Sequence, residues 1–357
     1  MTAEQLWDRL HSSPELSGRE SATKDIIQDF IEKETDLVLC RRDSWLYGLH
    51  REEGAAQTIA LRADMDALPD GRCGAWHGCG HDGHMAMLLD AARLLRGRRV
   101  GRNVIFLFQP AEETGQGARQ CLSLFDEQHV DRIYGCHNIP GYAEGTVLLA
   151  KDTFADASEG LILDFQGREC HAACPEEGIS PAPLIAQLIL QLPEITAKVG
   201  EKGFAQTTLI SVHVGEENFG ISAGQGRLCL TIRAEKDQIL QELESLIVSR
   251  AKAGARSAGL MMSLERRDIF PATVCDRQLS RQLEQVMTRA GIPCRYLPAP
   301  MRWSEDFGHY GSRTRAVFFG IGSGEDQPGL HTPDYVFPRE LVKTGGRIWM
   351  QIIEHAL

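Results

Sequence analysis

The chain has 357 residues, of which 43% are hydrophobic and 24% are charged, and its formal net charge is -11. This length exceeds what one ordinary core needs, and it favours two domains in a soluble globular protein. The acidic balance argues against a nucleic-acid-binding surface, and no apolar run is long enough to span a membrane.

The first residues of the chain and its cysteine content both bear on the cellular compartment in which we expect the protein. The first residues lack the basic start and the apolar stretch of a signal peptide. Ten cysteines without a secretory signal are typical of reduced thiols, some of which can bind a metal. We therefore expect a cytoplasmic protein.

The first part of the chain alternates helices and strands. Hydrophobic periodicity predicts helices over Ser21–Lys33 and Met85–Leu95, and strands over Thr58–Ala63, Val104–Phe108 and Asp131–Cys136. Strands separated by helices of this length imply a largely parallel sheet with helices on both faces. In such sheets, the loops at the carboxyl ends of the strands hold the ligand site.

A second pattern begins near Ser158. It predicts a strand, a helix, two strands, a helix and a strand, over Leu161–Phe165, Pro181–Val199, Thr207–Val214, Arg227–Arg233, Lys236–Ala253 and Leu260–Glu265. This order is the split βαβ arrangement of a ferredoxin-like α+β domain. The first pattern then returns, with a helix, a strand and a closing helix over Cys275–Ala290, Ala316–Gly320 and Arg339–Ala356. We predict that residues 156–267 are inserted into an α/β catalytic domain formed by residues 1–155 and 268–357.

Polar clusters gather near the ends of the first strands, and one more precedes the closing helix. They are Arg62–Asp66, Cys79–His84, Gln109–Glu113, Gly135–Asn138 and Leu330–Pro333. Thiolate, imidazole and carboxylate groups are the ligands of zinc and related metals. The clusters therefore predict a metal site at one edge of the sheet.

Glu112 and Glu113 are adjacent, so in an extended backbone their side chains point to opposite sides. One carboxylate can then bind metal while the other takes a proton from a water whose pKa the metal lowers. The residues alone leave other interpretations open. These are a solvated pair of glutamates, a structural zinc site of Cys73, Cys79, His81 and His84, and a second structural metal at Cys170, His171 and Cys174.

The strings Cys79–His84 and Gln109–Glu113 resemble the aminoacylase/carboxypeptidase metallopeptidase superfamily. The likeness is strongest to its amidohydrolase branch, which includes hippurate hydrolase, auxin-conjugate hydrolases and N-acyl-L-amino-acid amidohydrolases. Shorter matches are His11–Ser17, Leu61–Pro69, His137–Asn138, His171–Ala173, Phe270–Val274, Ser304–Phe307 and Leu330–Pro333. The resemblance implies a phosphorylase/hydrolase-like catalytic domain with a mixed, mostly parallel sheet and an inserted lid or dimerisation domain.

The resemblance also implies a function and a set of site residues. It indicates a metal-dependent amidohydrolase of N-acyl amino acids or related conjugates, with two divalent ions per chain, Zn²⁺ or Mn²⁺ and also Co²⁺ or Ni²⁺. The implied metal ligands are Cys79, His81, Glu113, His137 and His331, with Cys79 as the bridging ligand. The implied general base is Glu112, and His171 stabilises the carbonyl oxygen. Asn218 and Arg233 fall where the family contacts the substrate carboxylate or its surroundings. We expect Asp64, Asp66, Asp82 and His84 to orient the ligands from outside.

The sequence departs from the amidohydrolase branch at positions that concern the identity of the substrate and not the metal chemistry. The loop between Asp66 and Cys79 is short, two cysteines flank His171, and Asn218–Ser222 replaces a more usual Asn-Val-Ile-Pro. A dipeptidase or carboxypeptidase of the same superfamily is the alternative function. For Arg233 the alternative is an ordinary surface arginine. The expected partners are a small N-acyl amino acid and a second copy of the chain bound through the inserted domain, so His171 acts either in its own chain or across a dimer.

Overall fold

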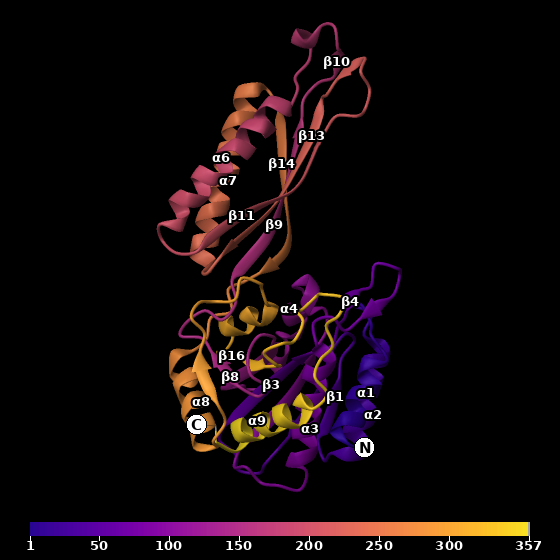
Figure 1. Ribbon diagram of the computed structural model, residues 1–357, viewed down its shortest axis with the longest axis vertical. Coiled ribbons are helices and arrows are strands. Elements are labelled where there is room, and N and C mark those ends of the chain that lie inside the picture. Colours follow the sequence, from indigo (N-terminus) through magenta and orange to yellow (C-terminus); the bar gives the residue numbers. More distant parts are fainter. Residues whose placement is uncertain (356–357) are drawn as a thin grey trace. The chain divides into compact units, whose positions relative to one another are not determined.

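The computed structural model describes residues 1–355. The chain divides into two compact units (Figure 1). Unit 1 comprises Met1–Phe154, Thr273–Pro300 and the segment that starts at Glu305, and unit 2 comprises Ala155–Ala272 and Met301–Ser304. Among the described residues, no helix has both the length and the apolar character needed to cross a membrane.

Unit 1 is built on an eight-stranded sheet with the order β1-β2-β6-β3-β7-β16-β8-β15. The four central strands, β6, β3, β7 and β16, are parallel. In contrast, β2 pairs antiparallel with both β1 and β6, and β16 pairs antiparallel with β8. This confirms the predicted mixed, mostly parallel sheet. The strands are β1 (Val38–Arg41), β2 (Leu46–His50), β3 (Thr58–Asp64), β6 (Asn103–Gln109), β7 (Arg132–Ile139), β8 (Val147–Leu149), β15 (Cys294–Tyr296) and β16 (Arg315–Gly322).

The helices of unit 1 are α1 (Ala3–His11), α2 (Ser21–Glu34), α3 (His81–Leu95), α4 (Gly117–Cys121), α5 (Leu124–Glu127), α8 (Arg277–Arg289) and α9 (Leu341–His355). The predicted end of the closing helix, Ala356, lies outside the described residues. Short elements complete the unit: η1 (Glu112–Thr114), η3 (Asp306–Ser312), and the paired strands β4 (Leu68–Pro69) and β5 (Ala75–Trp76).

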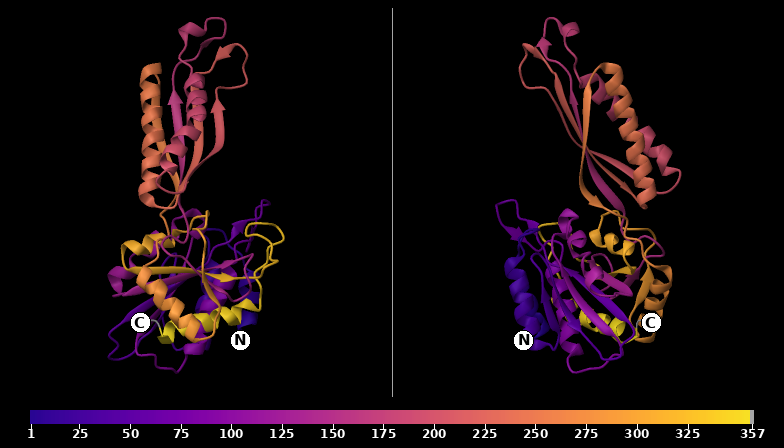
Figure 2. Two further views of the ribbon diagram at one scale, coloured as in Figure 1. Left: turned by 60° about the vertical axis from the view of Figure 1, so that its left-hand side comes forward. Right: turned by 180° about the vertical axis from the view of Figure 1, so that it is seen from behind.

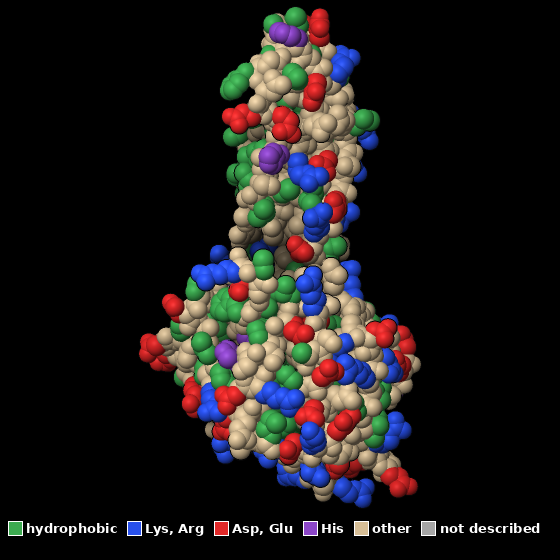
Figure 3. Space-filling view, turned by 90° about the vertical axis from the view of Figure 1, so that its right-hand side faces the viewer, with side chains coloured by type: hydrophobic (Ala, Val, Ile, Leu, Met, Phe, Trp, Pro, Cys, Tyr) green, Lys and Arg blue, Asp and Glu red, His purple; other side chains and the backbone are tan. Residues whose placement is uncertain are grey.

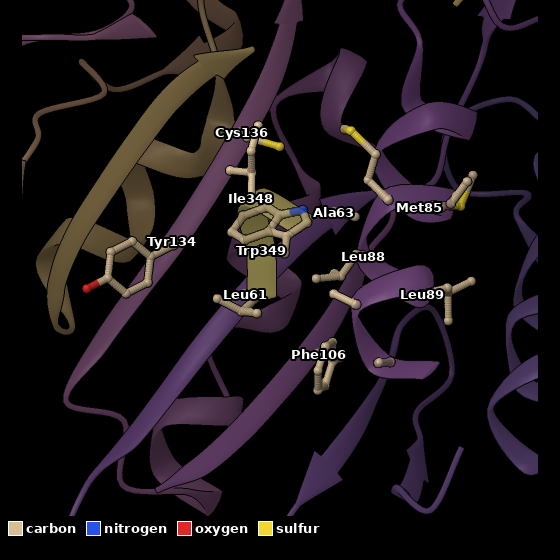
Figure 4. Close-up of a cluster of buried hydrophobic side chains, with 14 of the residues drawn as sticks. Leu61, Ala63, Met85, Leu88, Leu89, Phe106, Tyr134, Cys136, Ile348 and Trp349 are labelled. Carbon is tan, nitrogen blue, oxygen red and sulfur yellow. The ribbon is translucent and has the colours of Figure 1, made fainter. Parts of the chain in front are cut away.

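The core of unit 1 lies between the sheet and the helices α3 and α9, which pack against each other (Figure 4). Leu61 and Ala63 of β3 and Trp349 of α9 are buried in it. Because side chains alternate along a strand, Arg62 and Asp64 of β3 point to the opposite side of the sheet. The hydrophobic pattern thus also fixes which side of β3 carries its polar residues.

Helix α3 starts at His81, four residues before the predicted start at Met85. Gly80 precedes it with a φ of +93°, and a Cβ at this position would lie 2.5 Å from Oδ1 of Asn138. Only glycine combines this left-handed backbone with such a close contact. The early start places the whole of His81–His84 in the first turn of the helix.

Unit 2 contains a four-stranded antiparallel sheet with the order β11-β13-β9-β14. Its strands are β9 (Ala157–Gln166), β11 (Ala205–Val214), β13 (Gln225–Ala234) and β14 (Met261–Phe270), and its helices are α6 (Ala182–Gly200) and α7 (Asp237–Ala258). Both helices pack on one face of the sheet, where the apolar residues of this unit are buried (Figure 2). Along the chain the elements run strand, helix, strand, strand, helix, strand, which is the predicted order. A short pair, β10 (Cys170–His171) and β12 (Ile221–Ser222), and the turn η2 (Pro175–Glu177) lie outside this sheet.

The role of Gly80 can be tested by comparing two substitutions. Gly80→Ala should lower the free energy of unfolding by roughly 2–4 kcal/mol, because it adds a steric clash to left-handed strain. Gly97→Ala is the matched control, since Gly97 has a φ of +71° but a Cβ added there would meet no atom within 4 Å. It should cost only about 1 kcal/mol. Urea unfolding in the presence of a chelator measures both, and equal losses would contradict the role assigned to the contact with Asn138.

Candidate metal centre

Five side chains from separate parts of unit 1 converge at the carboxyl edge of the parallel strands. The Sγ atom of Cys79 lies 3.3 Å from Nε2 of His137 and 3.3 Å from Nε2 of His331. Oε1 of Glu113 lies 3.6 Å from Nε2 of His331 and 3.8 Å from Nε2 of His81. The structure therefore brings together all five side chains that the family resemblance implies as metal ligands.

The possible ligand atoms form two groups that share one residue. Cys79, His81 and His137 form one group, and Cys79, Glu113 and His331 form the other, with the atoms of each group within 4.8 Å of one another. A thiolate can bind two metal ions at once. Cys79 is common to both groups, so it would be a ligand in each of them if both held an ion, which agrees with the role that the resemblance implies for this residue.

The histidine rings are oriented by bonds on their outer sides. Nδ1 of His81 donates to the backbone oxygen of Asp66 at 2.9 Å, and Nδ1 of His137 donates to the backbone oxygen of Asn138 at 2.8 Å. In each ring the unprotonated Nε2 then faces the cluster. Nε2 of His81 and Oε1 of Glu113 are buried and have no hydrogen-bond partner among residues 1–355. Buried acceptors without donors are stabilised by a cation.

Electrostatics also fit a cation at this place. Burial, together with the carboxylates of Glu113 and Glu112, raises the pKa of the Cys79 thiol well above its usual range. Burial likewise raises the pKa of Glu113 to about 7. The thiolate and the carboxylate are therefore unfavourable here unless positive charge compensates them. Divalent ions supply that charge, and sulfur, nitrogen and oxygen donors together suit zinc and its neighbours.

Side chains behind the ligands hold them in place. Oδ2 of Asp66 accepts hydrogen bonds from Oγ of Ser17 at 2.6 Å and from the backbone N–H of Glu113 at 3.0 Å. Asp82 lies 2.6 Å from Nδ1 of His11. Asp66 thus links two of the predicted ligands, since it also lies beside His81.

Both ring nitrogens of His84 lie within hydrogen-bond distance of side chains other than the five proposed metal ligands. Its Nδ1 lies 2.7 Å from Oδ1 of Asp64, and its Nε2 lies 2.6 Å from Oδ1 of Asn138. The alternative structural zinc site needs His84 and Cys73 as ligands. Cys73 is exposed on the loop between β4 and β5, and no candidate metal group within residues 1–355 contains it. The structure therefore does not support that alternative.

The expected extended backbone at Glu112 and Glu113 is wrong. The two residues open the 3₁₀ turn η1, after Ala111 with its left-handed φ of +48°. A left-handed alanine is strained, and such strain is often found at functional sites. The turn brings both carboxylates within 4.8 Å of the free ring nitrogen of His81, so they do not point to opposite sides.

A buried ionic network lies beside Glu112, and sequence reasoning assigned no role to most of its members. Arg62 is completely buried and donates to Asp64 at 2.7 Å, Glu305 at 2.9 Å and Asp306 at 3.0 Å. The backbone N–H of Asp306 donates to Oε1 of Glu112 at 3.4 Å. Burial and then the carboxylates of Glu305, Glu113 and Asp306 raise the pKa of Glu112 well above its usual range. The sequence signal that could have indicated this network was one arginine and several acidic residues in the strings Leu61–Pro69 and Ser304–Phe307.

The remaining predicted residues belong to unit 2. His171 of β10 pairs with Ile221 of β12, and the backbone N–H of Ala173 donates to Nδ1 of His171 at 3.0 Å. In the neutral ring the proton is therefore on Nε2, which can donate. Asn218 lies at the same end, because its Oδ1 accepts from Gly220, whose backbone oxygen accepts from Ala172. The described residues place no candidate metal group at Cys170, His171 and Cys174.

Arg233 lies elsewhere in unit 2. It stands eight residues after the start of β13, about 27 Å along the strand from the end near β12. Its Nη1 donates to the backbone oxygen of Arg302 at 2.9 Å and to Oγ of Ser304 at 3.0 Å. The structure therefore brings Asn218 close to His171, but not Arg233.

Known proteins with similar sequences identify the family. The sequence pattern of peptidase family M20/M25/M40 matches residues 60–355. The chain belongs to this family. Its M20 relatives include IAA-amino acid hydrolase ILR1-like 2 of Arabidopsis thaliana, 26% identical over 360 residues that cover 95% of this chain and 82% of the relative. Hippurate hydrolase of Campylobacter jejuni is 25% identical over 355 residues, which cover 95% of this chain and 92% of that relative. The chain is thus a hydrolase of the M20 family, and the resemblance predicted from the sequence is confirmed.

Solved structures of other proteins have the same fold. The YXEP protein of Bacillus subtilis, described as a dinuclear metal binding peptidase from the M20 family, aligns with a TM-score of 0.82 and 22% identity, covering 99% of this chain and 96% of that one. Aminobenzoyl-glutamate utilization protein from Klebsiella pneumoniae aligns with a TM-score of 0.73 and 17% identity, and the alignment covers 99% of this chain and 94% of that one. At these identities the likeness shows a shared fold.

Thiol labelling tests Cys79 as a metal ligand. A metal-bound thiolate is shielded, so a maleimide should label Cys79 slowly in the metal-loaded protein and faster after chelation. Cys73 is exposed and outside the cluster, so it should be labelled at the same rate in both states. Peptide mapping by mass spectrometry separates the ten cysteines. Equal labelling of Cys79 with and without metal would remove it from the ligand set.

Proposed function

We propose that the chain is a metal-dependent amidohydrolase that cleaves the amide bond of N-acyl amino acids or related amino-acid conjugates. The observation that carries the proposal is the convergence of Cys79, Glu113 and three histidine Nε2 atoms, with Glu112 beside them. By their names, the two relatives act on an amino-acid conjugate and on hippurate. Both names fit hydrolysis of an amide next to an amino acid.

In this proposal two divalent ions per chain, Zn²⁺ or Mn²⁺, are held by Cys79, His81, Glu113, His137 and His331. When bound, they would lower the pKa of a water molecule and polarise the substrate carbonyl. Asp64, Asp66, Asp82 and His84 keep the ligands oriented.

Glu112 is the proposed general base. Its carboxylate takes a proton from the attacking water and then gives it to the leaving amine, so no covalent enzyme intermediate is needed. Its surroundings suit both steps. Burial and then the neighbouring acids raise the pKa of Glu112, which favours holding the proton, and the Asp306 N–H fixes one oxygen in place.

His171 is the proposed donor to the carbonyl oxygen as negative charge develops on it. The bond from Ala173 keeps the lone pair of the neutral ring on Nδ1, so Nε2 presents a proton. We propose Asn218, at the same end of unit 2, as a substrate contact. Arg233 remains a proposed substrate contact, and its bonds to Arg302 and Ser304 hold the guanidinium in one position.

A dipeptidase or carboxypeptidase is the alternative, since the similar YXEP protein is described as a peptidase. A panel of N-acyl amino acids beside a panel of dipeptides separates the two functions. We expect higher kcat/KM values on the acyl amino acids. Higher values on the dipeptides would replace the proposed function by the alternative.

We also propose a homodimer, formed through unit 2 in its role as a lid and dimerisation domain, in the cytoplasm. The strand β11 is at the edge of its sheet and contains no charged residue and no proline. Leu209, Ile210 and Val212 of this strand are exposed. An uncharged edge strand with exposed apolar side chains favours pairing with another chain. All ten cysteines are free thiols, as a reducing compartment requires.

Paired substitutions test the two adjacent glutamates. Glu112→Gln should keep the metal content near two ions per chain and lower turnover by at least roughly 10²-fold, because the general base is lost. Glu113→Gln should lose metal instead, because a ligand is lost. Metal analysis and steady-state kinetics measure both. Activity of Glu112→Gln within a few-fold of the unsubstituted protein would show that another group is the base.

A mixing experiment tests how His171 acts. His171→Ala should bind metal normally and lose roughly 10²-fold or more in turnover. If His171 acts across a dimer, mixing this variant with Glu112→Gln should restore activity to roughly a quarter of the unsubstituted level, since half the dimers are mixed and each has one complete site. No recovery after verified subunit exchange would place His171 in its own chain's site.

A further inference from the structure

The ligand His331 is held differently from the other two histidine ligands. Its side chain is 52% exposed, whereas His81 and His137 are buried. Histidine also reaches the surface of unit 1 in the space-filling view, next to hydrophobic side chains (Figure 3). His81 and His137 each donate from Nδ1 to a backbone oxygen, but no group within residues 1–355 accepts a hydrogen bond from Nδ1 of His331. The orientation of the His331 ring therefore depends on its backbone.

The backbone at His331 is strained. Its φ of +62° lies in the left-handed region, which a residue with a Cβ rarely adopts. Its N–H donates to the backbone oxygen of Gly78 at 2.9 Å, and the three residues that follow, 332–334, are all exposed. A strained conformation of this kind persists only where the surrounding structure fixes it. The loop that carries His331 therefore needs a further anchor.

Tyr335 is the first buried residue after His331, and only 2% of it is exposed. The amide Nδ2 of Asn138 donates a hydrogen bond to the hydroxyl oxygen of Tyr335. On the loop side, the backbone N–H of Tyr335 donates to the backbone oxygen of Thr332 at 2.9 Å. Tyr335 thus closes the turn after His331 and ties it to strand β7.

The partner of Tyr335 is itself part of the metal centre. Asn138 is completely buried at the end of β7, and its backbone oxygen accepts the hydrogen bond from Nδ1 of His137 at 2.8 Å. Its side-chain Oδ1 lies 2.6 Å from Nε2 of His84. These contacts fix the amide group of Asn138. One hydrogen bond therefore connects the loop of His331 to the residue that orients His137.

We propose that Tyr335 is a positioning residue for the metal ligand His331 and acts through its hydrogen bond to Asn138. The bond holds the loop where Nε2 of His331 lies 3.3 Å from Sγ of Cys79. The group of Cys79, Glu113 and His331 therefore owes its affinity for an ion partly to this hydroxyl. In the other group, the histidine rings have hydrogen bonds of their own. The inference rests on the proposed two-metal centre, and it adds a residue that is not itself a ligand.

The test measures the two stepwise dissociation constants of Zn²⁺ for the full chain, by competition with a chromogenic chelator. Tyr335→Phe removes only the hydroxyl, and it should weaken one binding step by at least roughly tenfold, as is typical when a group that orients a ligand is lost. His331→Ala identifies the step that depends on His331, and the two variants should weaken the same step. Tyr134→Phe is the matched control, because Tyr134 is equally buried but lies in the hydrophobic core of unit 1. It should leave both steps unchanged.

A second comparison tests the hydrogen bond itself. In a chain that already carries Asn138→Ala, Tyr335→Phe should change neither binding step by more than about twofold, because the bond is already absent. A full tenfold loss on this background would assign the hydroxyl to another partner and overturn the inference.

The remaining outcomes separate the inference from the function on which it rests. Unchanged Zn²⁺ affinity in Tyr335→Phe would overturn the inference, and so would an equal loss at both steps, which is the result expected of a merely structural role. Binding of fewer than two Zn²⁺ ions by the unsubstituted chain would contradict the proposed two-metal centre itself, and the inference with it. None of these measurements uses a substrate, so failure to cleave acyl amino acids would overturn the proposed activity and leave the inference in place.

Discussion

Buried negative charge at the carboxyl edge of the parallel sheet is the constraint on which the rest of this structure depends. Carboxylates and a thiol meet there, away from water, and each raises the cost of ionising the others. Arg62 compensates part of this charge on one side through its three acidic partners. In the cluster around Cys79, the rings of His81 and His137 can turn their Nε2 lone pairs toward the centre, because Nδ1 of each ring donates to a backbone oxygen. A centre of this kind is stable when metal ions supply the missing positive charge.

The fold creates this concentration of charge without disturbing the core. Along β3, Leu61 and Ala63 enter the apolar layer with α3 and α9, while the alternating residues Arg62 and Asp64 reach the opposite side. Glycine at position 80 then allows α3 to begin within contact distance of β7. The ligands are therefore presented by short turns at the ends of rigid elements, which limits how far they can move.

Much of the fold could be predicted from the sequence, because long amphipathic helices and apolar strands have a clear periodicity. The start of α3 could not be predicted, because it depends on the left-handed backbone of Gly80 and not on hydrophobic periodicity. The turn at Glu112 depends similarly on a left-handed Ala111. The ligand types were predictable from the clusters and the family likeness. The partnership of Arg62 with Glu305 was not, because 243 residues separate them and single-sequence patterns do not report contacts at such distances. Nor does any pattern reveal the two-residue strands β10 and β12, which bring Asn218 to His171.

His331 has a further consequence, which concerns how the protein is made. Its backbone N–H bonds to the oxygen of Gly78, and its ring completes the cluster around Cys79, 252 residues earlier in the chain. A chain growing on the ribosome releases its N-terminal part first. When Cys79, His81, Glu113 and His137 have emerged, all of unit 2 must still be synthesised before His331 arrives. A nascent chain therefore carries an open, thiol-containing half-site throughout the synthesis of unit 2, and the centre closes only afterwards.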